Sequence, residues 1–180
     1  MISSVLDRPL VRPFLPQRHY SRADQRETLA ELVERHGPLP AEVARECMLK
    51  IVEALRADVE AGLPHGRLTL ADVIIDDHGG VEVQRRNNGG NDPAALLADL
   101  AGIWHYLATG QTNDRLTGIR RPRFLAARLG WGRAPASLRT IQPETPEELD
   151  VIYRRLLSNQ PAERFPNLDS LAAALGAYAS

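Results

Sequence analysis

The stretch PAALLADLAGIWHYLAT, residues 93–109, decides the fold of this chain of 180 residues. The carboxylate of Asp92 can cap a helix that starts here, and Pro93 suits the first helical position, where a missing N–H costs little. Large apolar side chains occupy every side of the predicted helix: Leu96, Leu97, Leu100, Ile103, Trp104 and Leu107. Because a helix without a polar face is usually buried all round, we expect this one at the centre of the domain.

Helices are predicted on both sides of this centre. The strongest signal lies between Pro40 and Gly62, where apolar residues recur at every fourth position. This ladder consists of Val43, Cys47, Ile51, Leu55 and Val59, and Met48 and Val52 widen it. A shorter helix is predicted over residues 24–36 and ends at Gly37-Pro38. Two closing helices are predicted, one after Pro146 and one capped by Asn167.

The spacing of apolar residues changes between the predicted helix after Pro40 and the central helix. Residues 73–75 and 81–83 are short β-branched runs, and the turn between them contains Gly79 and Gly80. This pattern predicts a β-hairpin. The turn, residues 76–80, has a faint likeness to a calcium loop, but the later ligands of such a loop are missing. We therefore favour an ordinary polar turn.

Composition excludes several classes of protein. The residues are 43% hydrophobic and 25% charged, which is typical of a globular domain. No run of about 18 apolar residues is present, so we expect no membrane span. With a single cysteine, Cys47, the chain has neither a disulfide framework nor a cysteine-based zinc site, and we expect a reducing, cytoplasmic compartment. No metal-ligand spacing or cofactor motif occurs, and His105 is interpreted as a core histidine. Nearly all basic residues are arginine, and this preference suggests a GC-rich bacterial genome.

Charge is balanced overall, with 22 basic and 23 acidic residues, but residues 111–140 are basic. This segment has seven arginines and one acidic residue, Asp114, and it is predicted to be irregular. A solvated surface is the favoured interpretation. An acidic protein partner is the next one, since Phe124 and Trp131 could anchor it. Nucleic acid comes last because the whole chain is not basic.

The order of these elements resembles the C-terminal lobe of eukaryotic-like Ser/Thr protein kinases. LVRPFLP (10–16) is similar to the strand that leads into the kinase hinge, and AGLPHGRLTLADVIIDDHGGVEV (61–83) resembles the run through the catalytic loop. LLSNQPAERFPNLDSLAAAL (156–175) resembles the last two helices of that lobe. The resemblance implies a mainly α fold with a small β-hairpin and no N-lobe. Residues 1–23 would be an extended, hinge-like segment, and residues 24–180 the helical domain.

Departures from the kinase pattern argue against catalysis. The resemblance places the proton-accepting position at Arg67 and the metal-binding asparagine at Asp72. A guanidinium stays protonated in proteins and cannot serve as a base. The second metal site falls near residues 85–87, where two arginines would repel Mg²⁺. Nine residues, 84–92, are too few for an activation loop. His65, at the start of the loop, is interpreted as structural.

We therefore expect a non-catalytic, pseudokinase-like interaction module: an adaptor, scaffold or regulator without cofactor, metal or catalytic residues. Its partner would be another protein, such as a kinase or an assembly component, or a second copy of the chain. Candidate partner-binding residues lie on the face that an N-lobe would cover and in the basic segment: Phe14, Leu15, Ile74, Arg120, Arg121, Arg123, Arg128, Trp131 and Arg133.

Two alternatives remain. One is a divergent phosphotransferase or nucleotide-binding enzyme that uses Asp72 with Asp76 or Asp77. The other is binding of nucleic acid or of an acidic partner through residues 115–139. Arg164 provides a check on the resemblance, because its kinase counterpart pairs with a glutamate of the activation loop. We expect Arg164 to find another acid, to stack, or to reach solvent, since an unpaired buried guanidinium is costly.

Overall fold

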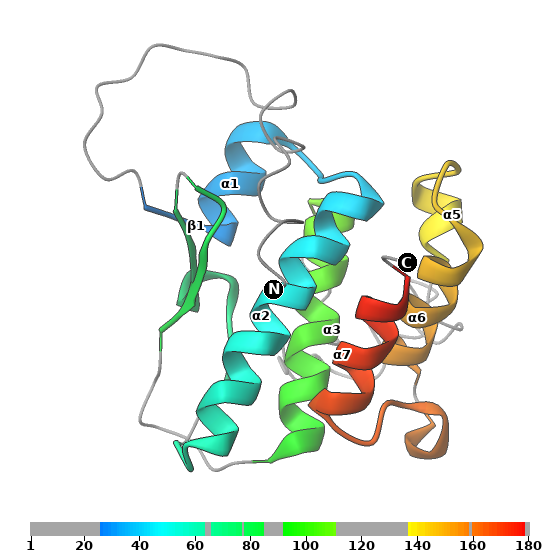
Figure 1. Ribbon diagram of the computed structural model, residues 1–180. Coiled ribbons are helices and arrows are strands. Elements are labelled where there is room, and N and C mark those ends of the chain that lie inside the picture. The colour runs from blue at the N-terminus through cyan, green and yellow to red at the C-terminus, as the bar shows by residue number, and fades with distance from the viewer. Residues whose placement is uncertain are drawn as a thin grey trace, which may run out of the picture.

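The computed structural model describes residues 26–63, 66–76, 78–84, 92–110, 137–158 and 160–178. These residues form a mainly helical fold with one small antiparallel sheet (Figure 1). The α-helices are α1 (Leu29–His36), α2 (Ala41–Glu60), α3 (Pro93–Thr109), α5 (Leu138–Ile141), α6 (Glu147–Leu157) and α7 (Leu168–Ala177). The strands are β1 (Glu27–Thr28), β2 (Val73–Ile75) and β3 (Val81–Val83), and short 3-10 turns span Leu70–Asp72 and Pro161–Glu163.

Helices α2 and α3 run side by side through the middle of the molecule (Figure 1). The sheet packs on one side of α2, and α7 packs on the other, while α6 packs against α3. Asp92 caps α3 by accepting a hydrogen bond from the N–H of Ala94 at 3.0 Å, and Pro93 occupies the first position. The prediction that residues 93–109 form the central helix is confirmed.

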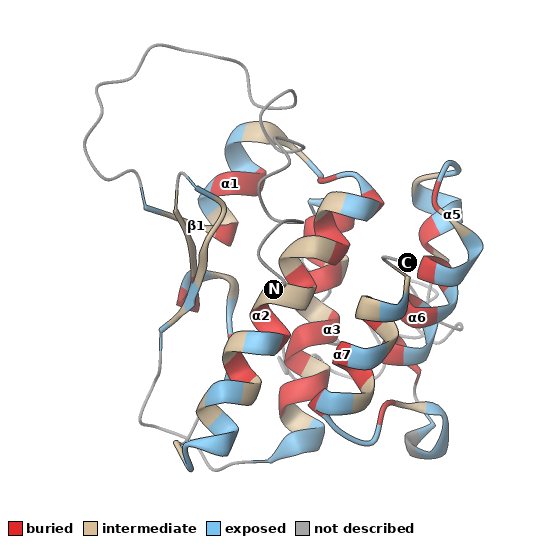
Figure 2. Ribbon diagram, in the orientation of Figure 1, coloured by how far each residue is buried: buried red, intermediate tan, exposed pale blue. Residues whose placement is uncertain are grey.

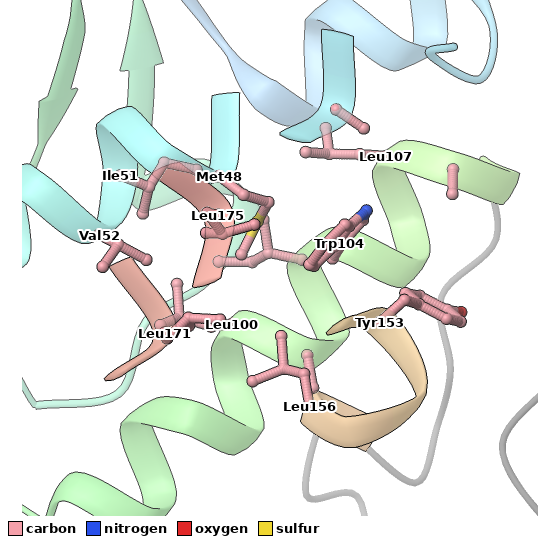
Figure 3. Packing of buried hydrophobic residues seen from close by; sticks show 14 of the residues in the cluster. Met48, Ile51, Val52, Leu100, Trp104, Leu107, Tyr153, Leu156, Leu171 and Leu175 are labelled. Carbon is pink, nitrogen blue, oxygen red and sulfur yellow. The ribbon is translucent and has the colours of Figure 1, made fainter. Parts of the chain in front are cut away.

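The hydrophobic core lies where α2, α3, α6 and α7 face one another, and the buried surfaces of these helices point inward (Figure 2). Trp104 of α3 is fully buried and meets Tyr153 of α6 edge to face, with ring centroids 5.7 Å apart. Figure 3 shows side chains from all four helices around it: Met48, Ile51, Val52, Leu100, Leu107, Leu156, Leu171 and Leu175. The two closing helices predicted after Pro146 and Asn167 are confirmed.

The sheet has the order β1-β2-β3. Strands β2 and β3 form the predicted hairpin, in which Ile74 lies opposite Glu82. Strand β1 was not predicted, and the expectation that a helix covers residues 24–36 is wrong for Glu27 and Thr28. Thr28 explains the difference: its side chain accepts from the N–H of Glu31, and its backbone N–H donates to the Glu31 carboxylate at 2.8 Å. A capping residue is extended, so it can join a sheet.

The inner face of α2 also differs from the prediction. Val59 is 50% exposed, and Val43 and Cys47 are only partly buried. In a helix, every fourth residue advances about 40° around the axis, so Val59 lies about 160° from Val43. A straight ladder over five turns therefore leaves the core. The apolar residues that α2 does bury follow the 3.6-residue period: Ala41, Ala44, Met48, Ile51, Val52 and Leu55.

Residues 137–141 are not irregular, contrary to the prediction for residues 111–140. Ser137 caps the short helix α5, its side chain accepting from the N–H of Arg139 at 3.2 Å. Leu138 is fully buried, while Arg139 is exposed. The Ser137 hydroxyl also donates to the buried carboxylate of Asp150 on α6 at 2.7 Å. This polar contact fixes α5 on α6, and apolar periodicity alone does not reveal it.

Two basic side chains of α2 tie neighbouring elements to it. Arg45 is buried and donates from Nη1 to the carbonyl of Leu175 near the end of α7 at 3.0 Å. Its guanidinium also lies over the ring of Tyr178, and a cation at a helix C-terminus is favourable. On the opposite side, the ammonium of Lys50 donates to the carbonyl of Gly79 in the hairpin turn. The side chains of Arg45 and Lys50 therefore connect α2 to elements that are distant in sequence.

Candidate functional site

The loop that resembles a catalytic loop leads from Gly66 into β2. Gly66 has a φ of 63°, a left-handed conformation that favours glycine. Arg67 is exposed, and Leu68 is buried in the core. The chain then turns through Thr69 and the 3-10 turn Leu70–Asp72. The loop therefore presents one side to solvent and anchors the other in the helical core.

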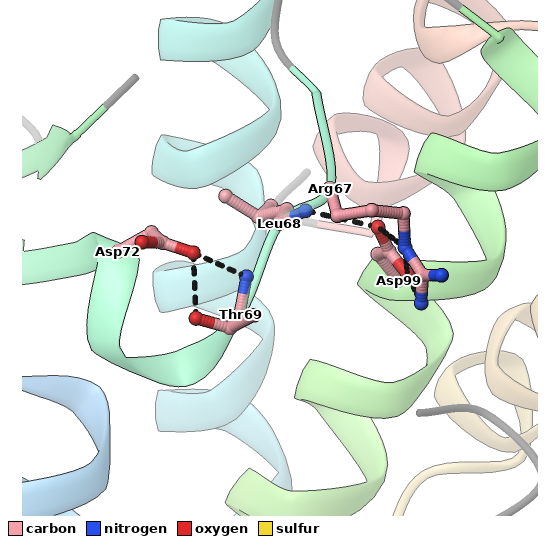
Figure 4. Close-up of polar contacts among 5 residues, drawn as sticks. All are labelled: Arg67, Leu68, Thr69, Asp72 and Asp99. Carbon is pink, nitrogen blue, oxygen red and sulfur yellow. Dashed lines mark hydrogen bonds and ion pairs between the residues drawn. The ribbon is translucent and has the colours of Figure 1, made fainter. Parts of the chain in front are cut away.

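Asp99 of α3 holds the first half of this loop (Figure 4). One carboxylate oxygen, Oδ2, accepts from the backbone N–H of Leu68 at 2.9 Å and from Nε of Arg67 at 3.0 Å. The other, Oδ1, lies 2.8 Å from Nη2 of Arg67. The Asp99 side chain is 3% exposed, whereas that of Arg67 is 56% exposed. The buried carboxylate is thus paired with a cation whose other side faces water.

This pairing determines what Arg67 can do chemically. Hydrogen bonding to Asp99, and then the charge of Asp99, raises the pKa of the Arg67 guanidinium above its usual value. The side chain therefore stays positively charged, and its nitrogens act only as donors. It can hold an anion or a carboxylate, but it cannot accept a proton from a hydroxyl group.

Asp72 holds the second half of the loop. Its Oδ2 accepts from the backbone N–H of Thr69 at 2.8 Å and from the Thr69 hydroxyl. The backbone of Asp72 contributes too, because its carbonyl accepts from the N–H of Gln84 beyond β3 at 2.6 Å. The residue is 2% exposed. Figure 4 shows the Asp72 and Arg67 contacts on opposite sides of Leu68, so the two side chains do not converge on one point.

Asp76 closes the hairpin turn. Its Oδ1 accepts from the N–H groups of His78 and Gly80 at 2.9 and 2.7 Å, which is the pattern of a polar turn. The interpretation of residues 76–80 as an ordinary turn is therefore confirmed for the residues described there. Within the described ranges, no group of three or more His, Cys, Asp or Glu side chains could hold a metal ion.

His105 and Arg164 lie away from the loop. Nδ1 of His105 is 2.7 Å from the Tyr153 hydroxyl, and burial lowers the pKa of its imidazole. His105 is therefore hydrogen-bonded as expected, but it is partly buried at the edge of the core. Arg164 is half-buried and donates from Nε to the carbonyl of Ser158. Arg164 is therefore not buried without a hydrogen-bond acceptor. A buried, unpaired Arg164 would have contradicted the resemblance in the last two helices.

Of the predicted partner-binding residues, only Ile74 is described. It is half-buried, and it lines a hollow of about 130 Å³ together with Arg26 and Glu82, which form an ion pair at 3.0 Å. The others, Phe14, Leu15, Arg120, Arg121, Arg123, Arg128, Trp131 and Arg133, lie outside the described residues, as do residues 1–23, His65, Asp77 and residues 85–87. The predictions made for them stay predictions.

Sequence reasoning missed Asp99, although the sequence carries a signal for it. Asp99 is the only Asp, Glu, Lys or Arg in residues 93–109. A lone carboxylate in a helix that is buried all round must have donors, since an unpaired buried charge is costly. That requirement points to a nearby basic residue and to backbone N–H groups. The sequence alone does not tell which ones.

Comparisons with known proteins add no family. No model of a protein family matches the chain, and none of the curated proteins matches it. Among the described helices, none is both long enough and apolar enough to span a membrane.

Proposed function

We propose that this protein is a non-catalytic, pseudokinase-like interaction module, an adaptor, scaffold or regulator in the signalling or assembly machinery of a bacterial cytoplasm. Two features support the proposal. One is the resemblance of the chain to a kinase C-lobe. The other is the mainly helical fold, in which the loop over residues 66–76 leads into a hairpin beside α2.

The pairing of Arg67 with Asp99 carries the argument. A phosphotransferase needs a proton acceptor close to the attacking hydroxyl. At the position that the resemblance assigns to this group, the chain has a guanidinium whose pKa is raised by Asp99. Asp99 itself is engaged with Arg67 and with the Leu68 N–H. Neither side chain is arranged to take a proton from a substrate.

The enzyme alternative depends on Asp72. A carboxylate that binds a magnesium ion must offer oxygen atoms to it, usually with a second ligand nearby. Asp72 is 2% exposed, and its Oδ2 accepts two hydrogen bonds from Thr69. These contacts support a structural role, in which Asp72 holds the loop against β3.

A thermal-shift experiment with ATP and Mg²⁺ or Mn²⁺ tests the proposal. We expect no shift for the wild type or for Asp72→Asn. A ligand at 100 times its dissociation constant would stabilise the fold by about 2.7 kcal/mol, which such a measurement resolves easily. Transfer of labelled phosphate by the wild type that Asp72→Asn abolishes would overturn the proposal.

The interaction itself is tested at Ile74, on the face of the sheet that it shares with Arg26 and Glu82; we call this the outer face of the sheet. Ile74→Asp places a charge in the hollow beside Arg26 and Glu82, and we expect it to weaken binding of the native partner by at least about tenfold. Val151→Asp is the matched control, because Val151 is 47% exposed on α6. Equal binding by both variants and the wild type would exclude this face as the interaction surface.

A further inference from the structure

An apolar pocket of about 190 Å³ opens where three helix ends meet. It lies between the C-terminal end of α2 and the N-terminal ends of α3 and α7, at the lower end of the molecule in Figure 1. Its apolar walls come from Val59, Pro93, Leu96 and Leu168. Gly66, where the loop of Arg67 begins, also lines the pocket, whereas Arg67, Asp72 and Asp99 do not. Val59 is one of the most exposed large apolar residues described.

The size and lining of the pocket suit one apolar group. Cavities of about 150 Å³ with aliphatic walls take up benzene, so a phenyl ring fits here. None of the described side chains that line the pocket has a buried polar atom lacking a hydrogen-bond partner. The inner part of the pocket therefore demands no hydrogen bond from a ligand, and an apolar side chain satisfies it.

The mouth of the pocket is acidic. Three carboxylates line it, from Glu60, Asp92 and Asp169, against one cation, Arg56. Arg56 and Asp169 neutralise each other, since Nε of Arg56 lies 2.6 Å from Oδ1 of Asp169, and the carboxylates of Glu60 and Asp92 are left. Glu60 is exposed and has no ion-pair partner among the described residues. Charge complementarity therefore favours a positively charged group beside the apolar one.

We propose that this pocket binds a peptide segment of a partner protein through one aromatic side chain flanked by basic residues. An apolar anchor in a pocket with a charged rim is the usual arrangement of a binding hot spot. The inference rests on the proposed function, because it identifies the chemistry of a partner for the interaction module.

Three acetylated and amidated peptides test the proposal on the full chain labelled with ¹⁵N. The first has a phenylalanine between two pairs of arginines, the second replaces the arginines with glutamates, and the third replaces the phenylalanine with alanine. At about 20 mM salt, we expect the first peptide to shift the amide signals of Leu96 and Leu168 and to bind at least about tenfold more tightly than the others. Absence of a saturable shift at these amides overturns the proposal, and so does equal affinity for the first and third peptides.

Paired variants locate the binding. Val59→Asn should weaken binding of the first peptide about fivefold or more, while Val151→Asn, at a valine of similar exposure on α6, should leave it unchanged. Glu60→Gln should weaken binding about threefold, and Glu144→Gln, on the exposed turn before α6, should not. Equal effects within each pair overturn the assignment. Nucleotide binding would refute the proposed function without moving these amide signals, so the two failures can be told apart.

Discussion

The helical core and the loop-and-sheet region are held together by different forces. In the core, α2, α3, α6 and α7 meet through large apolar side chains such as Trp104 and Leu100. In residues 66–84, Leu68 and Val73 join the core, and three carboxylates add hydrogen bonds from the backbone that the helical core does not need: Asp99, Asp72 and Asp76. The difference teaches that apolar volume specifies how the helices pack, whereas carboxylate acceptors specify the path of the backbone between the apolar residues that anchor the loop and the hairpin.

The largest test of this comparison removes volume from the core. Trp104→Ala deletes a fully buried indole and its edge contact with Tyr153. We expect a loss of about 3–5 kcal/mol in the free energy of unfolding, measured by urea denaturation. Val151→Ala, at an exposed position of α6, is the control and should change it by less than about 0.5 kcal/mol. Similar losses in both variants would contradict the assignment of the core.

The next test removes the acceptor that holds the loop. Asp99→Ala leaves the buried Leu68 N–H without its partner, and we expect a loss of about 1–3 kcal/mol in the free energy of unfolding. Arg67→Gln is the matched change, because it keeps the Leu68 N–H bond and removes only the cation beside the buried Asp99 carboxylate, and we expect a smaller loss of about 1 kcal/mol. If both variants lost the same stability, the ion pair rather than the backbone hydrogen bond would be what holds the loop.

A smaller test lies where the two regions join. Thr28 belongs to β1 and also caps α1, so Thr28→Ala removes an acceptor from the first turn of the helix. The expected loss is about 1 kcal/mol in the free energy of unfolding by chemical denaturation. Thr140→Ala, on the exposed side of α5, provides a comparison and should be nearly neutral. An unchanged midpoint for Thr28→Ala would show that the cap does not stabilise α1.

The smallest expected effect is on the way the free energy of unfolding depends on pH, and it comes from the partly buried His105. Burial lowers the pKa of His105, so below about pH 6.5 the unfolded chain binds a proton that the folded chain does not. The contribution of His105 is therefore complete above about pH 6.5 and is lost as the pH falls through the lowered pKa. His105→Gln, which does not titrate, should lose less stability than the wild type between about pH 7 and pH 5. Parallel stability curves would exclude this contribution.

Much of the helical region could be predicted from the sequence because apolar spacing and capping residues are local signals. Asp92, Pro93 and Asn167 mark helix starts, and the structure has helices where they predict them. The hairpin strands at residues 73–75 and 81–83 were predicted with correct boundaries. Val59 was misplaced because a straight ladder ignores the drift of a 3.6-residue helix.

The contacts of the candidate site were not predictable in the same way. The partners of Asp99 are 31 and 32 residues away in the sequence, and Arg45 reaches Leu175 across 130 residues. No local pattern encodes such pairs, since they arise only after the helices have packed. The kinase resemblance placed Ile74 on the face that an N-lobe would cover, and the role assigned to it there stays a prediction.

Lys50 is the only lysine in the chain, and its ammonium is hydrogen-bonded to the Gly79 carbonyl. The unprotonated amine of a lysine is the nucleophile that attacks an acylating reagent, so Lys50 reacts more slowly while its nitrogen is held at the Gly79 carbonyl. The rate of acylation at this one side chain therefore reports how often the contact between Lys50 and the hairpin turn opens.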